Sequence, residues 1–231
     1  MFYLLVGHGS GDPRYQAVLA WCIQHSQMAL APVPVRGATL EHHPLPLSEQ
    51  ILAHARQLED LELKLIPLFM GSGVHLATDI PEQVARAHQR QPHLRVHLTP
   101  ALGSQVGVVR LLAQRLSPDC PWIVVAHGSR RPAFAQDVDH LVEQIKSRSR
   151  GLQVQVAFLS QSPTLGEQLQ YLYDRGYRHL GIQPLLLFPG GLLETLHAQA
   201  RCYPTLSIRW GSPLAPDPLV IEMIQDLARY A

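Results

Sequence analysis

Short apolar runs alternate with longer amphipathic stretches along the whole chain. Runs of about four to eight apolar residues between turn residues are typical of strands buried in a parallel sheet, whereas a 3.6-residue spacing indicates helices packed on it. The first half has predicted strands at residues 2–6, 33–40, 64–70 and 94–99, and predicted helices at 15–29, 47–58, 81–89 and 105–116. The second half has predicted strands at 122–126, 152–158, 179–187 and 206–210.

The two halves resemble each other in sequence. The segment VGHGSGDPR around His8 matches VAHGSRRPA around His127, and GATLEHHPLPLSEQI matches VAFLSQSPTLGEQL. LIPLFMGSGVHLATDI then matches IQPLLLFPGGLLETLH, and a final amphipathic stretch follows in each half. Four matches in the same order predict two homologous domains, residues 1–118 and 119–231, which meet near Ser117.

Alternation of strands and helices predicts an α/β fold with helices on both faces of a parallel sheet. Because the pattern occurs twice, we expect two tandem parallel-sheet domains related by pseudo-twofold symmetry. Ligands of open α/β sheets bind beyond the carboxyl ends of the strands. His8, Glu41 and His75 each follow a predicted strand of the first half, so we expect them on one rim.

Composition excludes several classes of partner. The formal net charge is +1, 16% of the 231 residues are charged and 6% are aromatic, which gives no footprint for nucleic acid. The apolar N-terminal run is too short to span a membrane and lacks a basic leader. The three cysteines form no CxxC pair and suit a reducing compartment. We therefore expect a cytoplasmic monomer that binds neither nucleic acid nor membrane.

The candidate chemistry lies at His8, Glu41 and His75. Two imidazoles and one carboxylate suit a divalent cation such as Fe²⁺, Co²⁺ or Ni²⁺, and a neutral imidazole also accepts protons. Taken alone, His8 in HGSGDP has a second interpretation, a hydrogen bond to a loop carbonyl. Its glycines also suggest a phosphate cradle, but neither GxGxxG nor GxxxxGK[ST] is present.

The sequence repeat offers an internal comparison for these three residues. His8 aligns with His127, whereas Glu41 aligns with Ser160 and His75 with Leu192. A packing role would be expected in both copies about equally. The unequal halves therefore predict one working site in the first half and a degenerate one in the second.

The segments HGSGDPR, ATLEHH, PLFMGSGVHLATDIPE, VAHGSRRP and LLLFPGGLLETL resemble the sirohydrochlorin chelatase family. The resemblance spans nearly the whole chain. It implies two flavodoxin-like, chelatase-like domains without a prosthetic group that insert Fe²⁺ for sirohaem, or Co²⁺ for cobalamin, into sirohydrochlorin. It also implies that His8, Glu41 and His75 bind the metal and transfer protons. Leu192 departs from this pattern, so a second active site is in doubt.

Further residues are candidates for binding the tetrapyrrole. Ser10, Arg14, His127 and Arg130 lie on the two HGS loops, where they either meet substrate carboxylates or remain solvated. Asp79 is either a partner of His75 or an acidic residue that offsets a helix dipole, and its place beside Pro81 favours the second interpretation.

Three functions compete for this sequence. The first is a chelatase, with iron favoured over cobalt. The second is a carrier of metal or tetrapyrrole without turnover, since a fold does not fix a function. The third is a hydrolase or phosphoryl-transfer enzyme that uses His8, for which neither an arginine-rich phosphate pocket nor a GxSxG motif is evident.

Overall fold

Two parallel sheets of four strands each form the framework of the computed structural model, which describes residues 1–71, 73–129 and 131–230. The strands run in the order β2-β1-β3-β4 in the first sheet and β6-β5-β7-β8 in the second. Both sheets thus have the same doubly wound order, and every pairing is parallel. This arrangement confirms the predicted fold class of two tandem α/β domains with parallel sheets.

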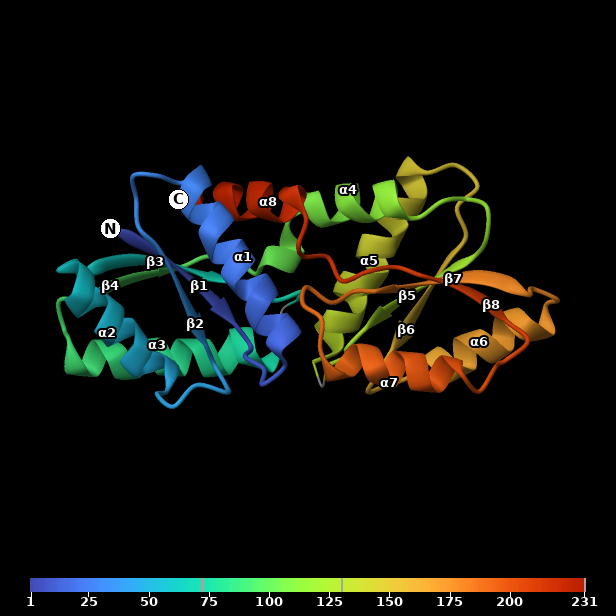
Figure 1. Ribbon diagram of the computed structural model, residues 1–231, viewed down its shortest axis with the longest axis horizontal. Coiled ribbons are helices and arrows are strands. Elements are labelled where there is room, and N and C mark those ends of the chain that lie inside the picture. Colours follow the sequence, from blue (N-terminus) through green and yellow to red (C-terminus); the bar gives the residue numbers. More distant parts are fainter. Residues whose placement is uncertain (72, 130, 231) are drawn as a thin grey trace. The chain divides into compact units, whose positions relative to one another are not determined.

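Strands and helices of the first sequence repeat alternate as predicted (Figure 1). They are β1 (Phe2–Gly7), α1 (Pro13–Ala29), β2 (Val35–Thr39), α2 (Leu47–Leu58), β3 (Glu62–Pro67), the π-helical turn η1 (His75–Asp79), α3 (Ile80–Arg90), β4 (Arg95–Leu98), the 3-10 turn η2 (Leu102–Ser104) and α4 (Val106–Arg115).

The second half repeats this order. Its elements are β5 (Trp122–Ala126), α5 (Pro132–Arg148), β6 (Val154–Phe158), α6 (Leu165–Asp174), β7 (His179–Pro184), α7 (Gly191–Ala200), β8 (Ser207–Trp210) and α8 (Pro218–Arg229). None of the helices in the described residues is long and apolar enough to cross a membrane.

Local chemistry explains where elements depart from their predicted limits. Helix α1 begins at Pro13, two residues early, because the Asp12 side chain accepts a hydrogen bond from the Arg14 backbone N–H at 2.8 Å. Helix α3 is preceded by a π-helical turn that the sequence pattern does not reveal. Strand β3 ends at Pro67, three residues before the predicted limit.

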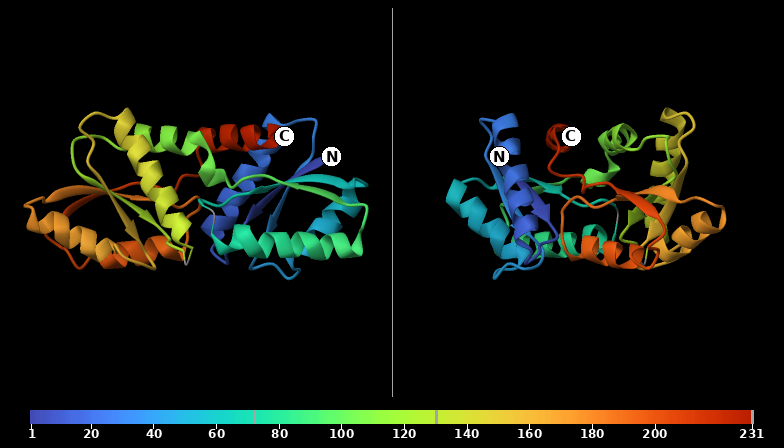
Figure 2. Two further views of the ribbon diagram at one scale, coloured as in Figure 1. Left: turned by 180° about the vertical axis from the view of Figure 1, so that it is seen from behind. Right: turned by 45° about the vertical axis from the view of Figure 1, so that its right-hand side comes forward.

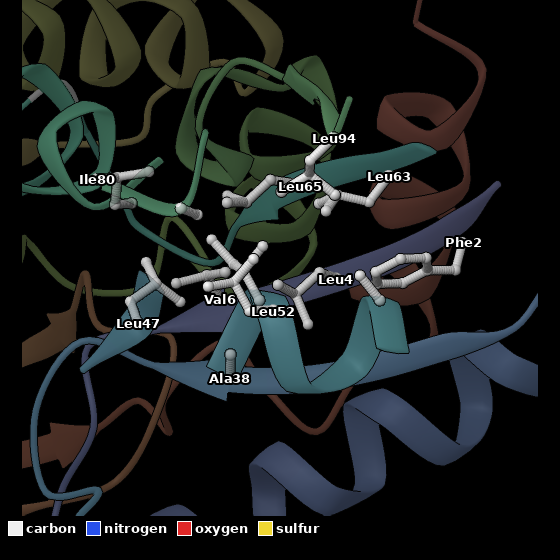
Figure 3. Close-up of a cluster of buried hydrophobic side chains, with 13 residues drawn as sticks. Phe2, Leu4, Val6, Ala38, Leu47, Leu52, Leu63, Leu65, Ile80 and Leu94 are labelled. Carbon is white, nitrogen blue, oxygen red and sulfur yellow. The ribbon is translucent and has the colours of Figure 1, made fainter. Parts of the chain in front are cut away.

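The core of the first sheet is formed by aliphatic side chains and one phenylalanine. Figure 3 shows side chains of β1, β3 and α2 meeting on one face of the sheet. Every residue of β1 is buried, as is expected for a central strand covered on both faces. Packing of this kind holds the strands rigidly. The positions at which the loops leave the carboxyl ends of the strands are therefore fixed as well.

The compact units of the structure differ from the repeats of the sequence. One unit comprises residues 1–105 and 215–231, and the other comprises residues 106–214. Helix α8, at the end of the second repeat, packs on α1, while α4, at the end of the first repeat, packs on α5 (Figures 1 and 2). The boundary at residue 118 stays a prediction for the repeats of the sequence, whereas the compact units have exchanged their last helices.

Hydrogen bonds secure each exchanged helix. Lys64 of β3 donates to the carbonyl oxygen of Ala228 in α8 at 2.9 Å, and Gln225 of α8 donates to the carbonyl oxygen of Ala29 at 3.2 Å. Arg115 at the end of α4 donates to the carbonyl oxygens of Pro213 and Leu214, at 3.0 and 3.2 Å.

This exchange predicts a reciprocal effect of two core substitutions. Leu112 in α4 and Ile224 in α8 are both fully buried, so replacing either with alanine should lower the free energy of unfolding by about 2–5 kcal/mol. Ile224→Ala should speed hydrogen exchange chiefly in α1 and β1, and Leu112→Ala chiefly in α5 and β5. Loss of protection confined to each helix's own sequence repeat would contradict the exchange.

A buried histidine predicts how stability depends on pH. His54 of α2 places Nε2 3.2 Å from the Gly37 carbonyl oxygen, and its buried Nδ1 has no hydrogen-bond partner among the described residues. Burial lowers the pKa of this imidazole, and the charges of Arg36 and His43 lower it further. As the pH falls below about 6.5, the unfolded chain takes up a proton that the folded chain resists.

The folded state should therefore lose stability toward acid, by at most about 1.4 kcal/mol per pH unit from this residue. Urea unfolding of wild type and His54→Gln between pH 7.5 and 5 isolates the contribution. Identical pH dependence of the two proteins would show that His54 does not resist protonation.

Candidate active site

Three loops of the first unit meet at the carboxyl edge of its sheet. His8 follows β1, Glu41 follows β2, and His75 opens the π-helical turn after β3. The rings of His8 and His75 are edge to face with centroids 4.8 Å apart, and His8 Nε2 lies 3.8 Å from Glu41 Oε1. The structure thus brings together the three residues that the strand-end argument places on one rim. Their metal-binding and catalytic roles remain predictions.

Close backbone contact joins the loops of His8 and Glu41. The Glu41 N–H donates to the His8 carbonyl oxygen at 2.8 Å. Gly9 lies between them with φ of +100°, and a Cβ added there would be 2.0 Å from the Glu41 carbonyl oxygen. Only glycine meets both demands, the positive φ and the missing side chain.

Tyr15 of α1 holds the loop that carries His8 and Gly9. Its hydroxyl oxygen accepts a hydrogen bond from the Gly9 N–H at 2.9 Å. Burial raises the pKa of this phenol to about 12, so the hydroxyl stays protonated. The sequence interpretation missed Tyr15, although its place one turn into a helix that starts beside the loop is a usable signal.

Partners of the two Nδ1 atoms set the orientation of both imidazoles. His8 Nδ1 lies 3.1 Å from the Gly9 carbonyl oxygen, and His75 Nδ1 lies 2.6 Å from Asp79 Oδ2. A carbonyl or carboxylate oxygen beside Nδ1 favours the tautomer with the proton there. Nε2 of each ring is then left as the atom with a free lone pair.

Asp79 differs from the interpretation that its position before a helix favours. Its side chain makes no capping hydrogen bond to α3 and instead faces His75. The π-helical turn from His75 to Asp79 places the two side chains together, and such turns are frequent at functional sites. Asp79 is therefore the partner of His75.

Phe69 forms an apolar wall beside the imidazoles, which the sequence interpretation did not identify. Its ring centroid lies 6.5 Å from that of His8 and 6.0 Å from that of His75. The Gly103 N–H donates to the Phe69 carbonyl oxygen at 2.8 Å, and a Cβ at Gly103 would be 2.1 Å from the Met70 carbonyl oxygen. A distant glycine thus holds this part of the loop.

The site is open to solvent and is not a closed metal cage. The side chains of His8, Glu41 and His75 are 43, 53 and 39% exposed. Across residues 1–71, 73–129 and 131–230, no three His, Cys, Asp or Glu side chains are arranged to hold a metal ion. Exposure of this kind leaves the three side chains accessible to a metal ion from solvent.

The residues predicted to bind the tetrapyrrole are dispersed. Ser10 Oγ accepts from the Asp12 N–H at 3.1 Å, and Arg14 donates to Asp12 Oδ2 at 2.7 Å. Hydrogen bonds from Arg14 hold the pKa of the Asp12 carboxyl below its ordinary value. His127 belongs to the second unit. Arg130 lies outside the described residues.

The second unit keeps the backbone contacts of the site and one histidine, His127, but has no counterpart of Glu41 or His75. Gly128 has φ of +91°, and the Ser160 N–H donates to the His127 carbonyl oxygen at 3.1 Å, as Glu41 does to His8. The Ser160 hydroxyl donates to the same oxygen at 2.9 Å. Leu192 stands in α7, where the first unit has its second histidine. The backbone contacts of these loops therefore do not require a carboxylate or a second histidine.

Two proteins of known name are similar to this chain in sequence. The sirohydrochlorin ferrochelatase of Priestia megaterium is 24% identical over 172 residues, and the match covers 71% of this chain and 65% of that protein, just under two thirds of its length. The sirohydrochlorin ferrochelatase of Bacillus subtilis is 23% identical over 205 residues, 86% of this chain and 78% of that protein.

Two solved structures share the fold. SirB from Bacillus subtilis with Fe³⁺ has a TM-score of 0.84 at 20% identity, over 98% of this chain and 93% of that one. CbiX, described as the terminal enzyme for biosynthesis of siroheme in denitrifying bacteria, has a TM-score of 0.73 at 22% identity, over 99 and 98% of the two chains.

The model of the CbiX family matches the chain twice, over residues 3–119 and 121–231. The matches cover both sequence repeats and confirm the family resemblance seen in the motifs around His8 and His75. Matched over nearly its whole length, this chain belongs to the CbiX family.

Proposed function

We propose that this chain is a chelatase that inserts a divalent metal ion, Fe²⁺, into sirohydrochlorin during sirohaem synthesis. The observation that carries the proposal is the pairing of His8 and His75, whose Nδ1 partners leave both Nε2 atoms available, with His8 Nε2 beside Glu41. Membership of the CbiX family and two relatives named sirohydrochlorin ferrochelatase support the choice of reaction and metal.

In the proposed reaction, one divalent cation replaces two pyrrole protons, so charge is balanced. His8 Nε2 and His75 Nε2 would first bind the metal and release it as metal–nitrogen bonds form in the macrocycle. The two lone pairs freed in this way would then accept the two pyrrole protons. The Glu41 carboxylate attracts the incoming cation, and Asp79 stabilises the positive charge that His75 acquires with a proton. Phe69 offers the macrocycle an apolar surface.

Cobalt insertion for cobalamin synthesis is the second candidate. A sirohydrochlorin chelatase SirB from a Bacillus subtilis subspecies was solved in complex with cobalt, and it is similar to this chain at a TM-score of 0.81 and 22% identity. Imidazole and carboxylate ligands accept both ions, and affinity alone ranks cobalt above iron, so the metal supply decides between them.

The remaining parts of the proposal concern the setting of the reaction. Ser10 and Arg14 would meet substrate carboxylates, with Arg14 exchanging its bond to Asp12 for one to substrate. His127 and Arg130 would be further contacts of the tetrapyrrole. The chain would work as a cytoplasmic monomer without a prosthetic group.

Substitution of one histidine tests the reaction. His75→Leu reproduces Leu192 of the second unit and should abolish insertion of both Fe²⁺ and Co²⁺, because one Nε2 is lost. Tetrapyrrole binding should persist, since the macrocycle has other contacts. Anaerobic incubation with each metal, followed by absorbance, measures insertion, and fluorescence quenching measures binding.

His127→Ala is the matched control, because no Glu41 or His75 equivalent accompanies it. It should retain more activity than His8→Ala. Near-wild-type turnover by His75→Leu would refute the site, and binding of both substrates by wild type without turnover would identify a carrier.

Asp79→Asn tests whether the Asp79 carboxylate acts as the partner of His75 or only offsets the dipole of helix α3. Loss of the carboxylate should lower kcat by about 10–100-fold, as removal of such partners typically does. Glu82→Gln, in the first turn of α3, is the control for the dipole. Equal, small effects of both variants on kcat would assign Asp79 to the helix alone.

A further inference from the structure

Strand β2 is an edge strand, and its last residue is bound by a side chain where a further strand would otherwise lie. Thr39 pairs with Gly7 of β1 in the sheet register. Gln50 of α2 accepts a hydrogen bond from the Thr39 N–H through Oε1 at 3.0 Å, and its Nε2 donates to the Thr39 carbonyl oxygen at 2.8 Å. One amide group thus takes the place of a neighbouring strand.

The same amide also reaches the far end of the loop that carries Glu41. Gln50 Nε2 donates to the Leu45 carbonyl oxygen at 2.9 Å. The residue is only 4% exposed, and its two N–H groups and its oxygen each have a partner. Buried polar groups with all partners in place hold one geometry, because losing a partner costs free energy. Gln50 therefore closes the loop between residues 39 and 45.

Glu41 is linked to this clamp through Thr39. The Thr39 hydroxyl donates to the Glu41 carbonyl oxygen at 2.9 Å, while the Glu41 N–H donates to the His8 carbonyl oxygen at 2.8 Å. The backbone of Glu41 is thereby fixed on both sides. Its carboxylate projects toward His8 from a backbone that Gln50 holds in place.

We propose that Gln50 is a positioning residue of the metal-insertion site, acting through Thr39 and the 40–46 loop to hold Glu41 facing His8. This inference rests on the proposed function for its catalytic consequence. Its structural part, the hold on the loop, stands on the hydrogen bonds of Gln50.

The second unit supplies the comparison. Gln168 of α6 occupies the corresponding place, since LSEQ in α2 matches LGEQ at the start of α6. It donates to the Val156 carbonyl oxygen at 2.9 Å, two residues before the end of β6. The Phe158 N–H at that strand end donates instead to the Pro163 carbonyl oxygen at 2.8 Å. In the second unit a backbone hydrogen bond therefore closes the loop after β6. In the first unit, which has Glu41, the side chain of Gln50 closes the loop after β2.

The test uses Gln50→Met, which keeps the length of the side chain and removes its polar atoms, with Gln168→Met as the matched control. We expect Gln50→Met to lower kcat for Fe²⁺ insertion by about 10–100-fold, the range for lost supporting contacts. The KM for sirohydrochlorin should change by less than about twofold, because the macrocycle contacts remain. Gln168→Met should leave both constants near wild type.

Two further measurements distinguish positioning from general weakening of the fold. Gln50→Met should lower the affinity for Co²⁺, measured by absorption without tetrapyrrole, and should speed hydrogen exchange at the 40–46 loop. In a double-mutant cycle, adding Gln50→Met to Glu41→Gln should cause little additional loss of kcat, because both act on one group. Should Gln50→Met fold poorly, Gln50→Glu keeps the acceptor for the Thr39 N–H and removes the donors to the carbonyl oxygens of Thr39 and Leu45.

The possible results separate the two proposals. Wild-type kcat in the Gln50 variants, or a loss of kcat that is fully additive with Glu41→Gln, overturns the positioning role alone. Absence of turnover by wild type with any metal overturns the proposed function, and hydrogen exchange and Co²⁺ binding then still decide whether Gln50 holds the loop. Unchanged exchange in the loop refutes the hold itself.

Discussion

Parallel pairing of β1 with β2 and β3 is the constraint from which the site of the first unit follows. All three strands end at the same edge, so the loops that carry His8, Glu41 and His75 start side by side. The buried residues of β1 fix the starting point, and Gly9 then allows the first two loops to touch through their backbones. The sheet therefore determines the geometry of the candidate site.

Comparison of the two units separates the supports of the site from its reactive groups. Both units have a left-handed glycine after the first strand, and a backbone N–H of the next loop donates to the carbonyl oxygen of the histidine just before that glycine. Ser160 and Leu192 then provide neither a carboxylate nor a second imidazole. Neutral side chains at these positions leave the loop contacts in place, because those contacts depend on peptide groups and on the absence of a Cβ.

Exchange of α4 and α8 makes the two sequence repeats interdependent. Each compact unit includes a helix contributed by the other repeat, bound through buried apolar side chains and through contacts such as Lys64 to Ala228. The first unit, which carries the candidate site, is therefore completed only by the last residues of the chain. A second repeat without the full ligand set still has a structural reason to remain.

The sequence by itself determined the α/β class, the repeat, the order of strands and helices, and that His8, Glu41 and His75 each follow a strand. These features depend on local apolar spacing and on residue identity along one segment. Tertiary structure alone decided that Asp79 faces His75, that Gln50 replaces a strand beside Thr39, and that α4 and α8 change places. Each of these depends on which atoms meet across the fold. The sequence specifies that a residue carries an amide or a carboxylate, but not which group it contacts. The contact can be with solvent, with a helix end or with a partner 11 residues away.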